Sequence, residues 1–158
     1  MQNRVNLAIA ESNQAYANSG IDLVLNLVHL EEDTSGYDID RVDQSSISPS
    51  LTALRSSTDG NLDYIHQLRM DVGADMVALI TAGAGCGIAN LCGNSPTAMP
   101  SANCVFSVTR WDCATGKWLF LEICYCCYVV VMLISYITAS FHLTNNNRIL
   151  LILPRTRT

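Results

Sequence analysis

The sequence predicts an α/β fold, and two observations carry that prediction. Helical and strand-like periodicities alternate along residues 1–117 in the order helix, strand, helix, strand. The segment 76–80, MVALI, is apolar throughout, which is typical of a parallel strand buried on both faces. At 158 residues the chain has room for one domain of ordinary size, and residues 118–158 differ from it as an apolar segment.

The first helix and the first strand follow from a change of period near residue 20. Apolar and small residues recur at helical spacing over 4–18, and Asn18-Ser19-Gly20 supplies a helix stop. From Ile21 the period becomes two, so we expect a strand that ends at Glu31-Glu32-Asp33.

A polar loop is predicted over residues 33–50, which are rich in Asp, Ser, Thr, Gly and Pro without a sustained period. Its acids are most simply a solvated face. Two alternatives stay open: a calcium site formed by Asp38, Asp40 and Asp43, which lacks the closing Glu of a known loop, and a binding module that uses the acidic stretch 31–43.

A second helix, a buried strand and a further strand complete the predicted domain. Thr58-Asp59-Gly60 opens the helix and Gly73 ends it, directly before the strand at 76–80. The glycines of the stretch 81–104 match neither a Rossmann nor a P-loop spacing, so we expect a flexible loop and no nucleotide. Residues 105–109 alternate and predict a strand at or near a sheet edge.

Charge and cysteine content exclude some classes of function. Residues 1–117 hold 13 of the 14 acids and 6 of the 9 bases, a net charge of −7, and residues 118–158 carry +2. Without a basic cluster, nucleic acid is excluded as a partner.

The first residues lack the apolar core of a signal peptide. Seven cysteines permit disulfides without requiring them.

Several segments of residues 3–120 together resemble one family. ESNQAYANSGIDL, VHLEE, LRSSTDGNLDYIHQLRMDVGADMVALI, CGIAN and FSVTRWDCATG are similar, in this order, to segments of the bacterial reprolysin-like metalloproteases of the metzincin group. The resemblance implies an incomplete metzincin-like domain with a mixed, mostly parallel sheet and flanking helices. It also implies a secreted zinc metallopeptidase that cleaves protein or peptide substrates.

The chain departs from this family at its zinc motif. In the family, the segment like DCATG is soon followed by H-E-x-x-H-x-x-G-x-x-H, in which three His hold zinc and the Glu acts as general base. Here KWLFLEICYCC has no His before Glu122. The three histidines, His29, His66 and His142, have no metal-binding spacing, and Cys124 with Cys127 would supply only two ligands. We therefore predict no catalytic residue, no metal ligand and no cofactor in this chain.

Two further expectations rest on the resemblance. Cys86 and Cys113 lie in the family-like segments CGIAN and DCATG, so we expect them to approach one another closely enough for a disulfide to be possible under oxidising conditions. In relatives a strand precedes the first helix and sits within the sheet, whereas here Met1 nearly begins that helix. The domain is therefore expected to be truncated at both ends.

The apolar tail admits two interpretations. A reading-frame change near Lys117–Ile123 would make residues 118–158 unselected sequence, leaving an inactive metalloprotease fragment over 1–117. Alternatively, the uncharged residues 123–141 form a transmembrane helix that anchors a non-catalytic domain in a membrane. On the first interpretation we expect the run 123–141 to bury little surface on the domain, and truncation after Gly116 to improve solubility and to leave the remaining fold no less stable.

Overall fold

The computed structural model describes residues 2–20, 22, 24–33, 35–37, 45–89, 105–115 and 147–153. These residues form three helices and one five-stranded sheet, which confirms the α/β class. In chain order the elements are α1 (Gln2–Asn18), β1 (Leu25–Glu32), α3 (Ser48–Arg55), α4 (Tyr64–Asp71), β2 (Met76–Thr81), β3 (Gly87–Ala89), β4 (Phe106–Arg110) and β5 (Asn147–Leu153).

The sheet is mixed and mostly parallel, with the strand order β1-β5-β2-β4-β3. β5 pairs in parallel with β1 on one side and with β2 on the other, and β2 pairs in parallel with β4. Only β3, at the edge, runs antiparallel to its neighbour β4. This arrangement fits the metzincin-like domain that the resemblance implies.

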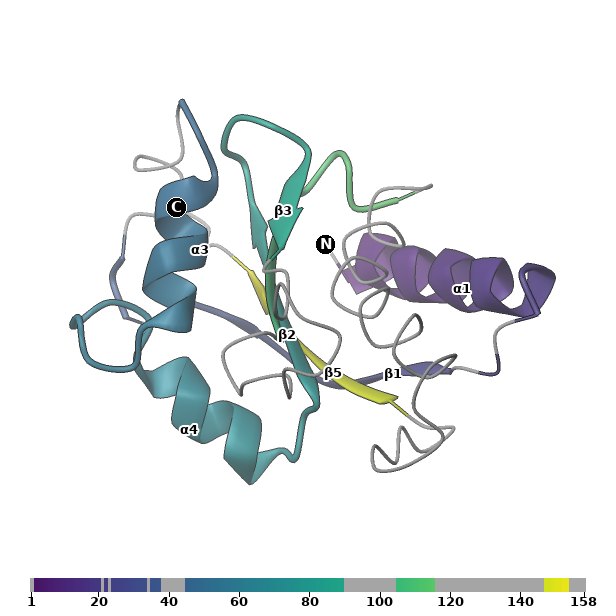
Figure 1. Ribbon diagram of the computed structural model, residues 1–158, viewed down its shortest axis with the longest axis horizontal. Helices are drawn as coiled ribbons and strands as arrows, with labels where there is room; N and C mark the ends of the chain where they lie inside the picture. Colours follow the sequence, from purple (N-terminus) through teal and green to yellow (C-terminus); the bar gives the residue numbers. More distant parts are fainter. Residues whose placement is uncertain are drawn as a thin grey trace, which may run out of the picture.

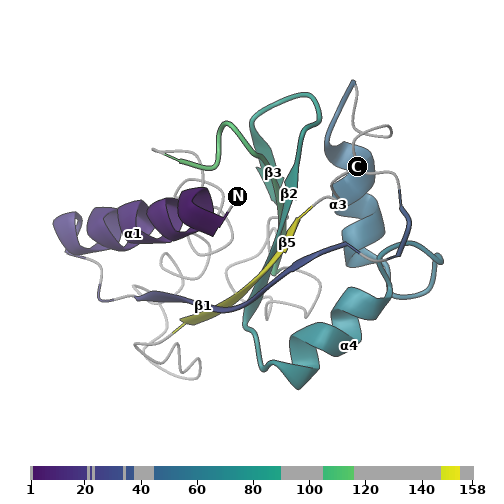
Figure 2. The ribbon, with the colours of Figure 1, turned by 180° about the vertical axis from the view of Figure 1, so that it is seen from behind.

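Helices cover the sheet on both faces, with α1 on one side and α3 and α4 on the other (Figures 1 and 2). Successive side chains of β2 point to opposite faces of the sheet, and helices cover both faces. Ala78 and Ile80 join the core cluster under α1, while Val77 and Leu79 join the cluster under α3 and α4. The all-apolar sequence of β2 therefore serves two cores, as predicted for a buried parallel strand.

Hydrogen bonds join α1 to β1 and end α4. Asn13 of α1 reaches β1 with both amide atoms: its Oδ1 accepts from the backbone N–H of Leu25 at 2.7 Å, and its Nδ2 donates to the Leu25 carbonyl at 3.0 Å. The predicted stop at Gly73 is present directly after α4, where this glycine has φ +61° and its N–H donates to the Met70 carbonyl at 3.1 Å.

Three elements differ from the sequence expectation. The helix predicted to open at Thr58-Asp59-Gly60 begins at Tyr64 as α4, after a turn in which Gly60 has φ +82°. α3 begins inside the stretch 33–50 that we predicted as loop, with Pro49 in its first turn, where the missing N–H costs no helical hydrogen bond. β3 lies inside the predicted loop 81–104. Its three residues are too few to show a period, and they form a strand because β4 offers a partner at Ser107–Thr109.

One part of the tail is described. Residues 147–153 form β5 within the sheet, between β1 and β2 (Figure 1). Residues 118–146 and 154–158, which include the predicted span 123–141, lie outside the described residues. Among the helices that are described, none combines the length and apolar character needed to cross a bilayer.

Candidate functional site

The carboxyl ends of β2 and β4 lie side by side and fix the turn that follows β4. The backbone N–H of Trp111 donates to the Thr81 carbonyl at 2.8 Å, and the N–H of Arg110 donates to the Cys86 carbonyl at 2.8 Å. Thr81 is fully buried, and its Oγ1 accepts from the Gly83 N–H at 3.0 Å. The segment that follows β4, where the family's zinc helix would begin, is therefore held on the connection between β2 and β3.

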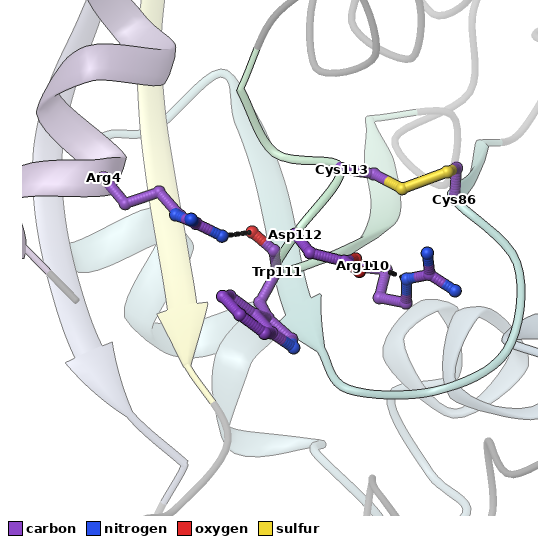
Figure 3. The surroundings of a disulfide bond; sticks show 6 residues. All are labelled: Arg4, Cys86, Arg110, Trp111, Asp112 and Cys113. Atoms are coloured by element: carbon purple, nitrogen blue, oxygen red, sulfur yellow. Dashed lines mark hydrogen bonds and ion pairs between the residues drawn. A yellow bond between two sulfur atoms is a disulfide. The ribbon is translucent and has the colours of Figure 1, made fainter.

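A disulfide joins the same two segments. Cys86, just before β3, is bonded to Cys113, in the turn after β4, and their Cα atoms are 5.4 Å apart (Figure 3). This separation lies within the usual range for a disulfide. Cys113 and the adjacent Ala114 are buried. The structure thus brings together the two cysteines that the family-like segments pointed to.

Arg4 at the start of α1 packs on the other side of this turn. Its guanidinium lies over the ring of Trp111, 4.5 Å from the centroid, and its Nη1 donates to the Trp111 carbonyl at 3.0 Å (Figure 3). Arg110 forms an ion pair with Asp112, and this hydrogen bond holds the pKa of the exposed Asp112 carboxyl below its usual range. The turn after β4 is therefore tied both to α1 and to the β2–β3 connection.

We expect Arg4→Ala to lower the free energy of unfolding by about 1 kcal/mol, because a half-exposed cation–π contact and one hydrogen bond are lost. The measurement is urea unfolding followed by tryptophan fluorescence, with Arg55→Ala, an exposed arginine at the end of α3, as the control. If Arg4→Ala and Arg55→Ala lowered the free energy of unfolding equally, a specific role for the Arg4–Trp111 contact would be contradicted.

The described histidines are engaged away from this turn. His29 on β1 contacts Glu31, with 3.0 Å between Nε2 and Oε2. His66 on α4 lies against the ring of Phe106, and its Nε2 is 3.1 Å from the Leu54 carbonyl, so this nitrogen carries the proton that is donated. Both contacts are those of structural histidines.

The described residues do not fit a zinc site. No three His, Cys, Asp or Glu side chains within the described ranges come together as a ligand set. The sulfurs of Cys86 and Cys113 are bonded to each other, so neither is a thiolate that could bind a metal.

Several residues weighed from the sequence lie outside the described residues. They are Asp38, Asp40 and Asp43 of the calcium alternative, together with Glu122, Cys124, Cys127 and His142. The structure adds one feature that the sequence did not reveal. Arg4 and Trp111 are 107 positions apart, and no local pattern at either position signals their contact.

Comparison with known proteins places this fold in a family. Residues 2–119 match the family model of the reprolysin-like metallopeptidases of family M12B. Over 121 residues the chain is 37% and 38% identical to peptidyl-Asp metalloendopeptidases of two Stenotrophomonas maltophilia strains, R551-3 and K279a. It is 34% identical to a protein of the same name from Xanthomonas campestris pv. campestris.

Each of these alignments covers 76% of this chain and 26% of the relative, so the chain spans about a quarter of the length of the curated relatives it matches. No solved structure gave a significant match. The family model covers most of the chain, including the turn that the Cys86–Cys113 disulfide holds. The chain therefore belongs to the reprolysin-like metallopeptidase family.

Proposed function

We propose that this chain is a zinc-less, catalytically inactive segment of a reprolysin-like metallopeptidase. The observation that carries the proposal is the sequence after DCATG, where KWLFLEICYCC stands in place of the H-E-x-x-H motif. The family match ends at residue 119, three residues into this stretch. The chain therefore retains the scaffold of the family and lacks the residues that would carry its reaction.

The chemistry of the missing motif explains why the scaffold alone is inactive. In a catalytic zinc site, three protein ligands leave one position open for a water, whose pKa the metal lowers to near neutrality. This chain offers Glu122 as a general base but no histidine beside it. The engagement of His29 and His66 elsewhere supports the same conclusion, because neither lies at the turn after β4.

The test is hydrolysis of peptides that contain aspartate, because the relatives are named peptidyl-Asp metalloendopeptidases. We expect the full chain with added zinc to release no fragments above background, while a Stenotrophomonas maltophilia relative cleaves the same peptides. Cleavage by this chain that a chelator abolishes would overturn the proposal.

We further propose that residues 118–158 diverge from the family through a change of reading frame near codon 117. The abrupt switch from family-like sequence to an uncharged, cysteine-containing run supports this origin. Reading the encoding DNA tests it. We expect codons for H-E-x-x-H in another frame just downstream, and their absence would remove the frame-change account.

A further inference from the structure

The turn between α3 and α4 presents the Asp59–Gly60 peptide bond to solvent. It lies at the periphery of the molecule, on the side away from α1 (Figures 1 and 2). Asp59 and Gly60 are both exposed. No atom beyond the chain neighbours of Gly60 lies within 4 Å of the position that a Cβ would occupy there. Because glycine has no side chain, the Gly60 nitrogen is sterically free to react with a neighbouring carboxyl group.

Two hydrogen bonds arrange this peptide bond for a reaction with the Asp59 side chain. The Gly60 N–H donates to Oδ2 of Asp63 at 3.0 Å, which places a carboxylate on the proton that the nitrogen must lose. The Asn61 N–H donates to Oδ1 of Asp59 at 2.9 Å. This second bond turns the Asp59 carboxyl back toward the main chain that follows it, and it polarises the C=O bond that the nitrogen attacks.

The Asp63 carboxylate is suited to accept that proton. Its other oxygen, Oδ1, is buried and has no hydrogen-bond partner within the described part of the chain. The main chain on both sides of Asp63 is held in place, because Leu62 is fully buried in the core and the His66 N–H donates to the Asp63 carbonyl at 3.2 Å. The fold therefore keeps this carboxylate next to the Gly60 nitrogen.

We propose that Asp59 is a modification site, at which the main chain converts to isoaspartate through a succinimide ring, with Asp63 as the base. The Gly60 nitrogen forms a bond to Cγ of the protonated Asp59 carboxyl, and the Cγ–Oδ2 bond breaks. Asp63 takes the proton from the nitrogen and returns it to the departing hydroxyl, which leaves as water. Water then adds to the main-chain carbonyl carbon of Asp59 in the ring and breaks the bond from this carbon to the nitrogen. The peptide is left linked through Cγ.

The reaction changes the connection into α4. It adds Cβ of Asp59 to the main chain, so the modified turn is expected to lose the Gly60–Asp63 hydrogen bond and to loosen the start of the helix. The reaction needs neither zinc nor peptidase activity. Its tests are therefore independent of the proposed function.

The first test is prolonged incubation of the folded full chain at neutral pH and body temperature, followed by tryptic digestion. Cleavage after Arg55 and Arg69 gives the peptide 56–69, SSTDGNLDYIHQLR. Fragmentation of this peptide by electron transfer distinguishes isoaspartate from aspartate at position 59. The rate at which isoaspartate accumulates there is the measured quantity.

Asp71 is the internal control in the same sample. The nitrogen that follows it belongs to Val72, a β-branched residue, and its N–H donates to the Leu68 carbonyl at 3.0 Å at the end of α4. We expect isoaspartate to accumulate at Asp59 at least about tenfold faster than at Asp71. Comparable accumulation at the two positions, or none at Asp59, would overturn the proposal.

Asp63→Asn tests the base. An asparagine oxygen still accepts from the Gly60 N–H but does not take up its proton, so isoaspartate at Asp59 is expected to form at least about tenfold more slowly in the folded variant. In concentrated urea the variant and the unaltered chain are expected to react at the same rate, because the Gly60–Asp63 contact is lost. Equal rates in the two folded proteins, or a difference that persists in urea, would overturn the proposal.

Asp59→Ser is the matched control for the position of the reaction. The serine hydroxyl can still accept from the Asn61 N–H, but it has no carboxyl carbon with which to close the ring. We expect no isoaspartate in the peptide 56–69 of this variant after the same incubation. Isoaspartate that still formed there at the rate of the unaltered chain would place the reaction at another residue and overturn the assignment to Asp59.

Discussion

Phe106→Ala is expected to lower the free energy of unfolding by about 3–5 kcal/mol, the largest effect of any single substitution considered. Phe106 begins β4 and is fully buried in the core beneath α3 and α4. Its ring lies 5.0 Å from the ring of His66, centroid to centroid. Removing the ring leaves a cavity at the point where the sheet and α4 meet, so packing is lost on both sides.

Urea unfolding followed by circular dichroism measures the loss. Phe106→Leu, which keeps most of the apolar volume, is expected to lose clearly less stability than the alanine variant. Met70→Ala on the exposed side of α4 is the surface control, since this side chain is 74% exposed. Equal destabilisation by Phe106→Ala and Met70→Ala would contradict the position assigned to Phe106 in the core.

The second large effect is expected at the disulfide. Replacing both Cys86 and Cys113 by alanine should lower the free energy of unfolding by roughly 3–4 kcal/mol, because the bond closes a loop of 27 residues in the unfolded chain. The bond also holds the turn after β4 on the β2–β3 connection. Its loss is therefore expected to weaken the contact between this turn and the β2–β3 connection, at the carboxyl ends of β2 and β4.

Reductant provides the matched control for this prediction. Dithiothreitol is expected to destabilise the unaltered chain by a similar amount and to leave the double alanine variant unchanged, as measured by urea unfolding under argon. An unaltered chain whose stability does not respond to reductant would show that Cys86 and Cys113 are not bonded in solution.

The parts of the fold that were predicted correctly are those with a strong local pattern. α1 repeats apolar residues at helical spacing before a Ser-Gly stop, and β2 is apolar over its whole length. β3 could not be found in this way, because a three-residue strand with two small residues has no period and exists through its pairing with β4. α3 was hidden because its start, Ser48-Pro49-Ser50, has the composition of a loop.

The site was predictable only where the family resemblance reached it. Proximity of Cys86 and Cys113 followed from the segments in which they lie, whereas the Arg4–Trp111 contact joins α1 to the turn after β4 across 107 positions. Such a contact depends on tertiary packing, and the periodicity of the sequence does not reveal it. The position of β5 was missed for a related reason. A run of only five apolar residues, 149–153, fits an unselected tail or a buried strand equally well, and the partner strands decide.

The central claim is that this chain keeps the scaffold of a reprolysin-like metallopeptidase without its zinc site. The most direct test is metal analysis of the purified full chain, by plasma mass spectrometry after incubation with excess zinc and exhaustive dialysis. Well below one zinc per chain is expected, because the sequence after DCATG supplies no set of three ligands. One retained zinc per chain, together with peptide hydrolysis that a chelator abolishes, would contradict the claim.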